Sequence, residues 1–299
     1  MSKFKGIIPP LVTPFVKNTK KVNVPVVKEH VEFMIKRGIH GIYVGGSTGE
    51  GLLMEASERN KLLETVVEQT NGRIAVIAHV GAIDTMTAIE LAKAAQRIGA
   101  DAVAAVEPFY HKYDDEALTG YFYDIANSVK DMKFFIYNNP ITTGHNIKPK
   151  LACKMAKKIH NLAGIKDSSE QIMQISDYVN YLPEYNFMVG NTGMIIPAFS
   201  IGVDAAVSGM ANCLPELLVD LWKIYLEGDS KKTAIKQHLV NRISNDLKAG
   251  PSIPVYKYIL TLRGFDFEYS LLPQRELTED EKAVIRTKYE EWKPELLLV

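Results

Sequence analysis

The feature that most constrains the fold of this chain is a regular alternation of short apolar segments with longer amphipathic ones. Eight segments rich in apolar or β-branched residues recur at fairly even intervals, and stretches with helical periodicity separate them. The apolar segments are 6–15, 41–46, 74–81, 102–109, 133–140, 162–168, 186–191 and 205–212. Strands that alternate with helices form parallel sheets, and eight such units favour a closed (β/α)₈ TIM barrel.

An open, doubly wound parallel sheet is the alternative arrangement. The first apolar segment is not followed by a GxGxxG turn into a helix, so the usual dinucleotide-binding fingerprint is absent. From Asp229 onward the strand pattern stops, and the remaining periodic segments indicate helices. We therefore expect an α/β fold with a (β/α)₈ barrel over residues 1–226 and a C-terminal helical extension over residues 227–299.

Charge and cysteine content exclude several classes of protein. The chain has 35 Lys+Arg and 35 Asp+Glu residues, so it carries no basic excess that would favour nucleic acid. Its two cysteines form no CxxC pair, and its histidines form no HExxH cluster, so no metal site is predicted. The N-terminus lacks the apolar region of a signal peptide, and no apolar run reaches the length of a membrane span. A cytoplasmic protein without membrane or nucleic-acid partners is expected.

Lys166 stands at the end of the sixth apolar segment, within Gly164-Ile165-Lys166-Asp167. An amine in a buried strand is desolvated, and desolvation favours its neutral form. A neutral lysine amine can attack a carbonyl carbon and form a Schiff base. The alternative is a lysine that leaves the strand and faces solvent, which is the commoner situation for this residue type.

The ends of three other apolar segments carry groups that bear on this choice. The second runs into Gly46-Ser47-Thr48-Gly49-Glu50, where backbone N–H groups and hydroxyls could hold a small anion or could form a plain tight turn. Tyr110 and Tyr137 follow the fourth and fifth segments, and each could transfer protons or serve as an aromatic plug. Together, an anion cradle, a buried lysine and a tyrosine suit a 2-oxo acid substrate. The iminium would itself act as the electron sink, so no metal or organic cofactor is predicted.

In its motifs and their order, the chain resembles the pyruvate-dependent class I aldolase superfamily of N-acetylneuraminate lyase and dihydrodipicolinate synthase. The resemblance covers nearly the whole chain. The matching motifs are Pro10-Leu11-Val12-Thr13-Pro14-Phe15, Gly46-Ser47-Thr48-Gly49-Glu50, Pro108-Phe109-Tyr110, Tyr137-Asn138-Asn139-Pro140, Gly164-Ile165-Lys166-Asp167 and Gly202-Val203-Asp204-Ala205-Ala206-Val207-Ser208-Gly209.

The resemblance implies a role for each matching residue. Lys166 would form the imine, and Tyr137 would be the proton donor and acceptor. Ser47 and Thr48 would hold the pyruvyl carboxylate, and the backbone of Val207 would contact the pyruvyl group.

The resemblance also implies that the active site extends across subunits. Ser47 and Tyr110 would continue a proton relay to Tyr137, and in this superfamily that second tyrosine often comes from a neighbouring subunit. A homo-oligomer is therefore expected, and the superfamily suggests a homotetramer.

The departures from the family pattern concern the second half of the substrate. Dihydrodipicolinate synthases carry an arginine shortly after the tyrosine motif, where this chain reads Ile141-Thr142-Thr143-Gly144 with no arginine. Sialic acid lyases carry an acidic pair after the seventh strand, where this chain has Asn191 and Thr192. Glu107 stands where a small hydroxyl residue is expected, and it could face the substrate pocket or pair with a neighbour behind it. We expect Thr142, Thr192 and Glu107 to determine substrate choice.

The sequence thus predicts a lyase that cleaves or forms a C–C bond between pyruvate and an aldehyde. Its 2-oxo acid substrate could be a 2-keto-3-deoxy sugar acid. One alternative is a dihydrodipicolinate synthase (4-hydroxy-tetrahydrodipicolinate synthase) that condenses pyruvate with aspartate semialdehyde. An alternative of another class is a non-catalytic pyruvate-binding sensor, against which the presence of both Lys166 and Tyr137 argues.

Overall fold

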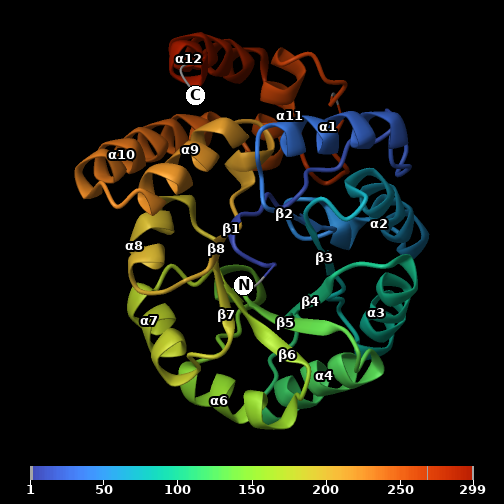
Figure 1. The fold of residues 1–299 in the computed structure, drawn as a ribbon. Coiled ribbons are helices and arrows are strands. Elements are labelled where there is room, and N and C mark those ends of the chain that lie inside the picture. The colour runs from blue at the N-terminus through green and yellow to red at the C-terminus, as the bar shows by residue number, and fades with distance from the viewer. Residues whose placement is uncertain (1–2, 268, 298–299) are drawn as a thin grey trace.

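The computed structural model describes residues 3–267 and 269–297, and its strands form one eight-stranded parallel sheet (Figure 1). Neighbouring strands follow the order β1-β8-β7-β6-β5-β4-β3-β2. The strands are β1 Gly6–Ile7, β2 Gly41–Val44, β3 Ala75–His79, β4 Ala102–Val106, β5 Lys133–Asn138, β6 Leu162–Asp167, β7 Asn186–Val189 and β8 Ala205–Ala206.

The sheet closes on itself between the segment after β1 and strand β2. A parallel bridge joins Pro10 to Tyr43, where the N–H of Leu11 donates to Tyr43 O at 2.9 Å and the N–H of Tyr43 donates to Pro9 O at 3.0 Å. The predicted (β/α)₈ barrel is confirmed, and the open doubly wound alternative is wrong.

Two strands are much shorter than their apolar segments suggested. Prolines 9 and 10 have no N–H to donate to a ladder, which helps to end β1 after Ile7. Beyond β8 the chain turns into the 3₁₀ helix η3 Gly209–Asn212. There the Asn212 side chain accepts from the N–H of Val12 and donates to Pro10 O, each at 2.9 Å, so side-chain hydrogen bonds connect the two chain segments.

Helices surround the barrel, as Figure 1 shows. A typical one is α3, where Asp84 caps the first turn by accepting from the N–H of Thr87 and Gly99 ends the helix at φ 95°. The helices of this ring are α1 Val24–Lys36, α2 Ala56–Thr70, α3 Thr85–Ile98, α4 Asp115–Ser128, α5 Pro140–Thr143, α6 Pro149–Lys158, α7 Ile172–Tyr181, α8 Ile195–Ser200 and α9 Pro215–Leu226.

The buried apolar side chains form two groups because successive strand residues face opposite sides of the sheet. The smaller group fills the barrel interior and includes Phe4, Tyr43, Tyr137 and Met188. Phe4 packs edge-on against Phe135 with ring centroids 5.2 Å apart. The larger group lies between the strands and the surrounding helices.

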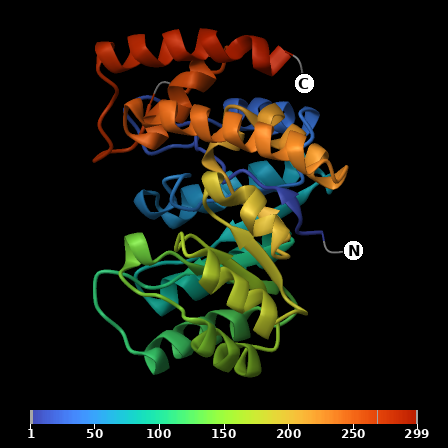
Figure 2. The same cartoon turned by 90° about the vertical axis from the view of Figure 1, so that its left-hand side faces the viewer.

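Three further helices follow the barrel and lie on one side of it, next to α1 and α9 (Figure 2). They are α10 Ser230–Asp246, α11 Ser252–Leu262 and α12 Glu279–Leu297. Buried residues of α10 and α11, such as Val240 and Ile259, belong to the same apolar core as the outer barrel residues. The predicted division between residues 226 and 227 falls between α9 and α10, and it stays a prediction. In the described ranges, no helix is both long and apolar enough to cross a bilayer.

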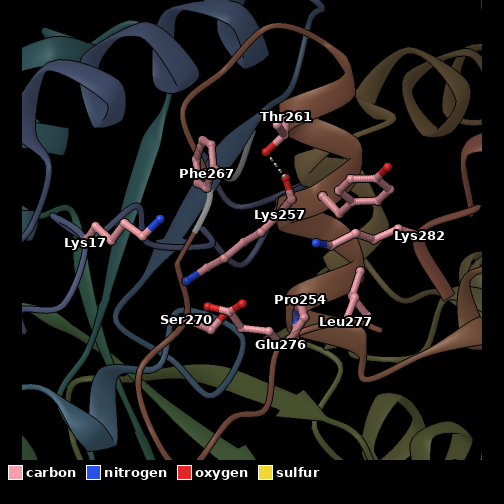
Figure 3. A pocket seen from close by; sticks show the side chains of 10 residues that line it. Lys17, Pro254, Lys257, Thr261, Phe267, Ser270, Glu276, Leu277 and Lys282 are labelled. Atoms are coloured by element: carbon pink, nitrogen blue, oxygen red, sulfur yellow. Dashed lines mark hydrogen bonds between the residues drawn. The ribbon is translucent and has the colours of Figure 1, made fainter. Parts of the chain in front are cut away.

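A buried ion pair fastens these C-terminal helices to the loop after β2. Lys257 of α11 donates to the Glu50 carboxylate, and both side chains are almost fully buried. Lys257 also donates to Tyr269 O at 2.8 Å, and Glu50 accepts from the N–H of Leu271 at 2.7 Å. Figure 3 shows the Lys257 side chain extended toward Ser270. Both residues line a cavity of about 300 Å³. The pair therefore links α11, the segment around residue 270 and the Gly46–Glu50 loop.

We predict that Lys257→Met lowers the free energy of unfolding by about 3–5 kcal/mol, because it leaves the Glu50 carboxylate buried without a counter-charge. The Lys257→Met/Glu50→Gln double variant should recover part of the loss, since an amide oxygen can still accept from Leu271. Denaturant unfolding at fixed protein concentration measures both.

The matched control is Lys282→Met, which removes one side of an i,i+3 pair with Glu279 on α12. That change should cost no more than about 1 kcal/mol, because its partner is solvated. If Lys257→Met is no less stable than Lys282→Met, the buried pair does not hold the extension in place.

Candidate active site

Lys166 lies near the carboxyl end of β6, inside the barrel. Its neighbours across the sheet are Tyr137 on β5 and Met188 on β7. The strands approach closely here: a Cβ on Gly164 would lie only 1.7 Å from Asn186 O, so the position requires glycine. The Lys166 side chain is only 5% exposed, and its Nζ lies 3.5 Å from the Tyr137 ring centroid and 4.4 Å from that of Tyr43.

Burial lowers the pKa of the Lys166 amine from 10.5 to about 7. Among the described residues no carboxylate forms an ion pair with this amine, so no counter-charge offsets the cost of burying its charge. An unpaired buried ammonium is expensive, which is why the neutral form is favoured. Near neutral pH a substantial fraction of Lys166 is therefore a nucleophilic amine.

Tyr137 places its ring beside this amine, and its hydroxyl has side-chain hydrogen-bond donors. Asn139 Nδ2 donates to it at 3.1 Å, and Ser168 Oγ donates to it at 3.5 Å. Burial raises the pKa of Tyr137 to about 12, while hydrogen bonds to Ser168 and Ser47 oppose this rise. The hydroxyl therefore remains protonated at neutral pH and has side-chain partners through which a proton can pass.

The loop after β2 forms a tight turn over residues 46–51. A Cβ on Gly51 would lie 1.9 Å from Gly45 O, so only glycine allows the chain to fold back this closely. Within the described part of the chain, the backbone N–H groups of Ser47 and Thr48 donate to no protein group. Two unpaired donors on adjacent residues suit a carboxylate oxygen. The N–H groups of residues 49–51 donate to Gly46 O and Ser47 O, so the loop is a hydrogen-bonded turn that leaves two N–H groups free for an anion.

A cavity of about 350 Å³ opens next to this loop. Thr142 and Ser47 both line it, which places two of the predicted substrate-binding residues in one wall. The lining residues are Ser47, Glu50, Leu52, Leu53, Val106, Phe109, Thr142, Thr143, Pro273 and Gln274.

Glu107 is fully buried behind that wall. Its Oε2 accepts from the N–H of Asn139 at 3.2 Å and from Thr143 Oγ1 at 3.4 Å. Its Oε1 has no partner among the described residues, and burial raises the pKa of the carboxyl to about 8. Of the two placements left open, the contacts match the group paired with a neighbour. Glu107 holds the β5–α5 turn, which carries the Asn139 amide that touches Tyr137.

The remaining predicted site residues are Val207, Thr192 and Tyr110, and their surroundings differ. Val207 belongs to the barrel-interior group, and its N–H donates to Val189 O at 2.8 Å. Thr192 is half-buried and shares a 2.7 Å hydrogen bond with Ser208 Oγ, and it does not line the cavity described above. Tyr110 is 85% exposed with φ 81°, and its ring packs against His111. Within the described chain, Tyr110 makes no hydrogen bond to Tyr137.

Sequence reasoning missed several residues of the site. Asn139 and Ser168 lie two positions after Tyr137 and Lys166, yet nothing in the sequence shows that both contact the Tyr137 hydroxyl. Tyr43 was also missed, although its place two residues before Gly45 indicates an inward-facing strand position. Its ring contacts Lys166, and its buried hydroxyl has no partner in the part of the chain that the structure describes.

The described residues contain no group of three or more His, Cys, Asp or Glu side chains placed to hold a metal ion.

Comparison with known proteins places this site in a family. A sequence model of the Dihydrodipicolinate synthetase family matches residues 3–291. An uncharacterized DapA-like lyase of Halobacterium salinarum is 33% identical over 280 residues, which cover 94% of this chain and 91% of that protein. The 4-hydroxy-tetrahydrodipicolinate synthase of Methanocaldococcus jannaschii is 32% identical over 283 residues, covering 94% and 96%.

Solved structures agree over nearly the whole chain. The sialic acid aldolase of Ruminococcus gnavus superposes with a TM-score of 0.94 at 26% identity, covering 99% of this chain and 100% of that one. YagE of E. coli K12, a prophage protein solved in complex with pyruvate, gives a TM-score of 0.93 at 28% identity, covering 98% and 99%. The sequence match and the shared barrel together show that this chain belongs to the dihydrodipicolinate synthetase family.

Proposed function

We propose that this protein is a lyase that binds pyruvate as a Schiff base on Lys166 and forms or cleaves a C–C bond between pyruvate and an aldehyde. The observation that carries the proposal is the buried, unpaired Lys166 amine, which lies 3.5 Å from the Tyr137 ring. Membership of a family that includes lyases and aldolases supports the same reaction class. The YagE structure with pyruvate shows that this fold can bind that substrate.

The first half of the mechanism concerns pyruvate alone. Its carboxylate would accept from the N–H groups of Ser47 and Thr48, which places the keto carbon toward Lys166. The neutral amine attacks that carbon, water leaves, and an iminium forms. The Tyr137 hydroxyl would supply the proton with which water leaves. Its phenolate would then take a proton from the methyl carbon next to the iminium, which becomes a nucleophilic enamine carbon. Val207, in the barrel interior, would contact the pyruvyl group through its backbone.

The second half joins pyruvate to the aldehyde. The enamine carbon attacks the aldehyde carbon, a C–C bond forms, and the aldehyde oxygen takes the proton of the Tyr137 hydroxyl. Ser47 interacts with the Tyr137 hydroxyl and lines the cavity. It would return a proton to the Tyr137 oxygen after this step. Water then hydrolyses the imine, which releases the product and regenerates Lys166. Cleavage of a 4-hydroxy-2-oxo acid follows the same steps in reverse.

A dihydrodipicolinate synthase remains a second candidate because several relatives carry the name 4-hydroxy-tetrahydrodipicolinate synthase. That reaction would require the protein to hold the carboxylate of aspartate semialdehyde. Thr142 lies in the segment in which we expected the synthase arginine, and it cannot supply a bidentate cation. The sensor alternative does not explain why Tyr137 has hydrogen-bonding partners suited to proton transfer.

We also propose that the working enzyme is a homotetramer in which Tyr110 completes the site of a neighbouring subunit. The support is its conformation: a large aromatic side chain that is 85% exposed, on a backbone with φ 81° that is unfavourable for a non-glycine residue. Such a side chain is suited to burial against a second copy of the chain.

Treatment with pyruvate and borohydride should add the mass of one reduced pyruvyl group per chain, because reduction traps the imine. Peptide mapping should place the adduct on Lys166. The second buried lysine, Lys257, serves as an internal control and should remain unmodified because Glu50 pairs with it. If the adduct is missing, or persists in Lys166→Ala, the Schiff-base mechanism fails.

The rate of imine trapping by cyanoborohydride should increase with pH and level off above a midpoint near the Lys166 pKa of about 7. The sign follows because burial lowers this pKa, so the neutral amine accumulates as the pH rises through that value. The pKa of Tyr137, about 12, predicts no opposing loss between about pH 6 and 9. A midpoint near 10, the ordinary range for lysine, would show that the amine is solvated.

Tyr137→Phe should lower kcat for the aldol reaction by about 10²–10⁴-fold, because it removes the proton donor but keeps the ring beside Lys166. Steady-state kinetics with pyruvate and an accepted aldehyde measure the loss, and circular dichroism checks folding. The matched control is Tyr43→Phe, which keeps the other ring beside Lys166 and removes a hydroxyl without a partner among the described residues. Equal activity of the two variants would remove Tyr137 from proton transfer.

A further inference from the structure

We infer that the aldehyde partner of this enzyme is uncharged and carries an apolar chain or ring, rather than a carboxylate or several hydroxyl groups. The inference rests on the proposed pyruvate chemistry and concerns the cavity of about 350 Å³ beside the Ser47 loop. That volume is near the lower end of the range for small-molecule sites, so the acceptor is a small aliphatic or aromatic aldehyde.

The first support is the apolar wall of the cavity, which several elements of the fold build together. Leu52 and Leu53 come from the 3₁₀ helix η1 Gly51–Leu53, Val106 ends β4, Phe109 follows that strand, and Pro273 lies in the segment after α11. The Leu52 side chain is 41% exposed. Binding of an apolar acceptor would remove the apolar surface of the wall from water, which lowers the free energy of the complex.

The polar residues of the wall offer little to a polyhydroxylated molecule. Thr142 Oγ1 donates to Asn139 O at 3.3 Å, and Thr143 Oγ1 shares its proton between the same oxygen at 3.0 Å and Glu107 Oε2 at 3.4 Å. Ser47 interacts with the Tyr137 hydroxyl, and the Gln274 amide makes no side-chain hydrogen bond within the described residues. A sugar chain would lose its hydration here and leave several hydroxyls unpaired.

The charge of the wall also excludes a carboxylated acceptor. The described lining residues include no lysine or arginine, and their only charged member is Glu50. Lys257 pairs with Glu50, so the local positive charge is already neutralised. A carboxylate placed beside Glu50 would be desolvated next to a like charge and would gain no cation.

The reaction that follows is balanced and needs no further reagent. Pyruvate and the aldehyde join through the enamine carbon, and the carbonyl π bond of the aldehyde becomes a hydroxyl after Tyr137 protonates its oxygen. Hydrolysis of the imine consumes the water that its formation released. The product is a 4-hydroxy-2-oxo acid whose apolar tail lies along Leu52, Leu53 and Phe109.

The test compares kcat/KM for four acceptors with pyruvate: butanal, benzaldehyde, D-erythrose and succinic semialdehyde, with aspartate semialdehyde as a second carboxylated probe. We expect butanal or benzaldehyde to exceed the hydroxylated and carboxylated aldehydes by roughly tenfold or more, the scale on which mismatched polar groups are rejected. Turnover of erythrose or a semialdehyde that equals or exceeds that of both apolar aldehydes would overturn the inference.

A designed variant should shift the preference from apolar to carboxylated aldehydes. Thr142→Arg places a guanidinium in the wall, and it should raise kcat/KM for succinic semialdehyde by about tenfold while lowering that for butanal. The matched control is Ile141→Arg, which adds the same charge at a neighbouring side chain that is 68% exposed and does not line the cavity. Ile141→Arg should keep the wild-type preference, and a shift as large as that of Thr142→Arg would contradict the role of the wall.

Borohydride trapping of pyruvate, run in parallel, tests the Schiff-base proposal separately from the class of aldehyde acceptor. Trapping on Lys166 with no turnover of either apolar aldehyde would retain the Schiff-base proposal and overturn the acceptor class. No trapping would overturn both, because an acceptor has no role without the enamine.

Discussion

The exclusion of water from the Lys166 amine is the physical constraint on which the rest of this site depends. The closed barrel surrounds the amine with aromatic rings from β2 and β5, and burial lowers its pKa to about 7. No carboxylate among the described residues pairs with it, so the fold maintains a neutral nucleophile. A nearby carboxylate would stabilise the ammonium and make this position less reactive. The isolation of Lys166 from negative charge is therefore as important as its burial.

The second half of the chemistry depends on how Tyr137 is held. Its hydroxyl bonds to the Asn139 side chain, and the Asn139 backbone bonds to the buried Glu107 carboxyl. Glu107 also accepts from Thr143, which lines the acceptor cavity. The Glu107 carboxyl thus bonds both to the turn that positions Tyr137 and to Thr143 in the cavity wall. This shared support couples catalytic geometry to the choice of acceptor, since moving the β5–α5 turn would disturb both.

The C-terminal helices contribute to the active site as well as to stability. Lys257 of α11 neutralises Glu50 at the end of the Ser47 loop, and Glu50 in turn holds the N–H of Leu271. The same segment continues to Pro273 and Gln274, which line the cavity. The chain thus returns from α11 to complete a wall that starts in η1 and β4. The absence of a cation among the described lining residues leaves this wall suited to neutral acceptors.

The sequence by itself determined the eight strand–helix units and pointed to Lys166 and Tyr137, because hydrophobic periodicity and local motifs are properties of short segments. It placed Lys166 and Tyr137 on neighbouring strands, and their side-by-side position follows from that order. Only the tertiary structure decided that Glu107 bonds to the Asn139 turn, that Lys257 pairs with Glu50 across 207 positions, and that Leu52, Val106 and Pro273 line one cavity. These contacts join segments distant in sequence, and their partners are set by how barrel closure and the packing of α11 bring those segments together.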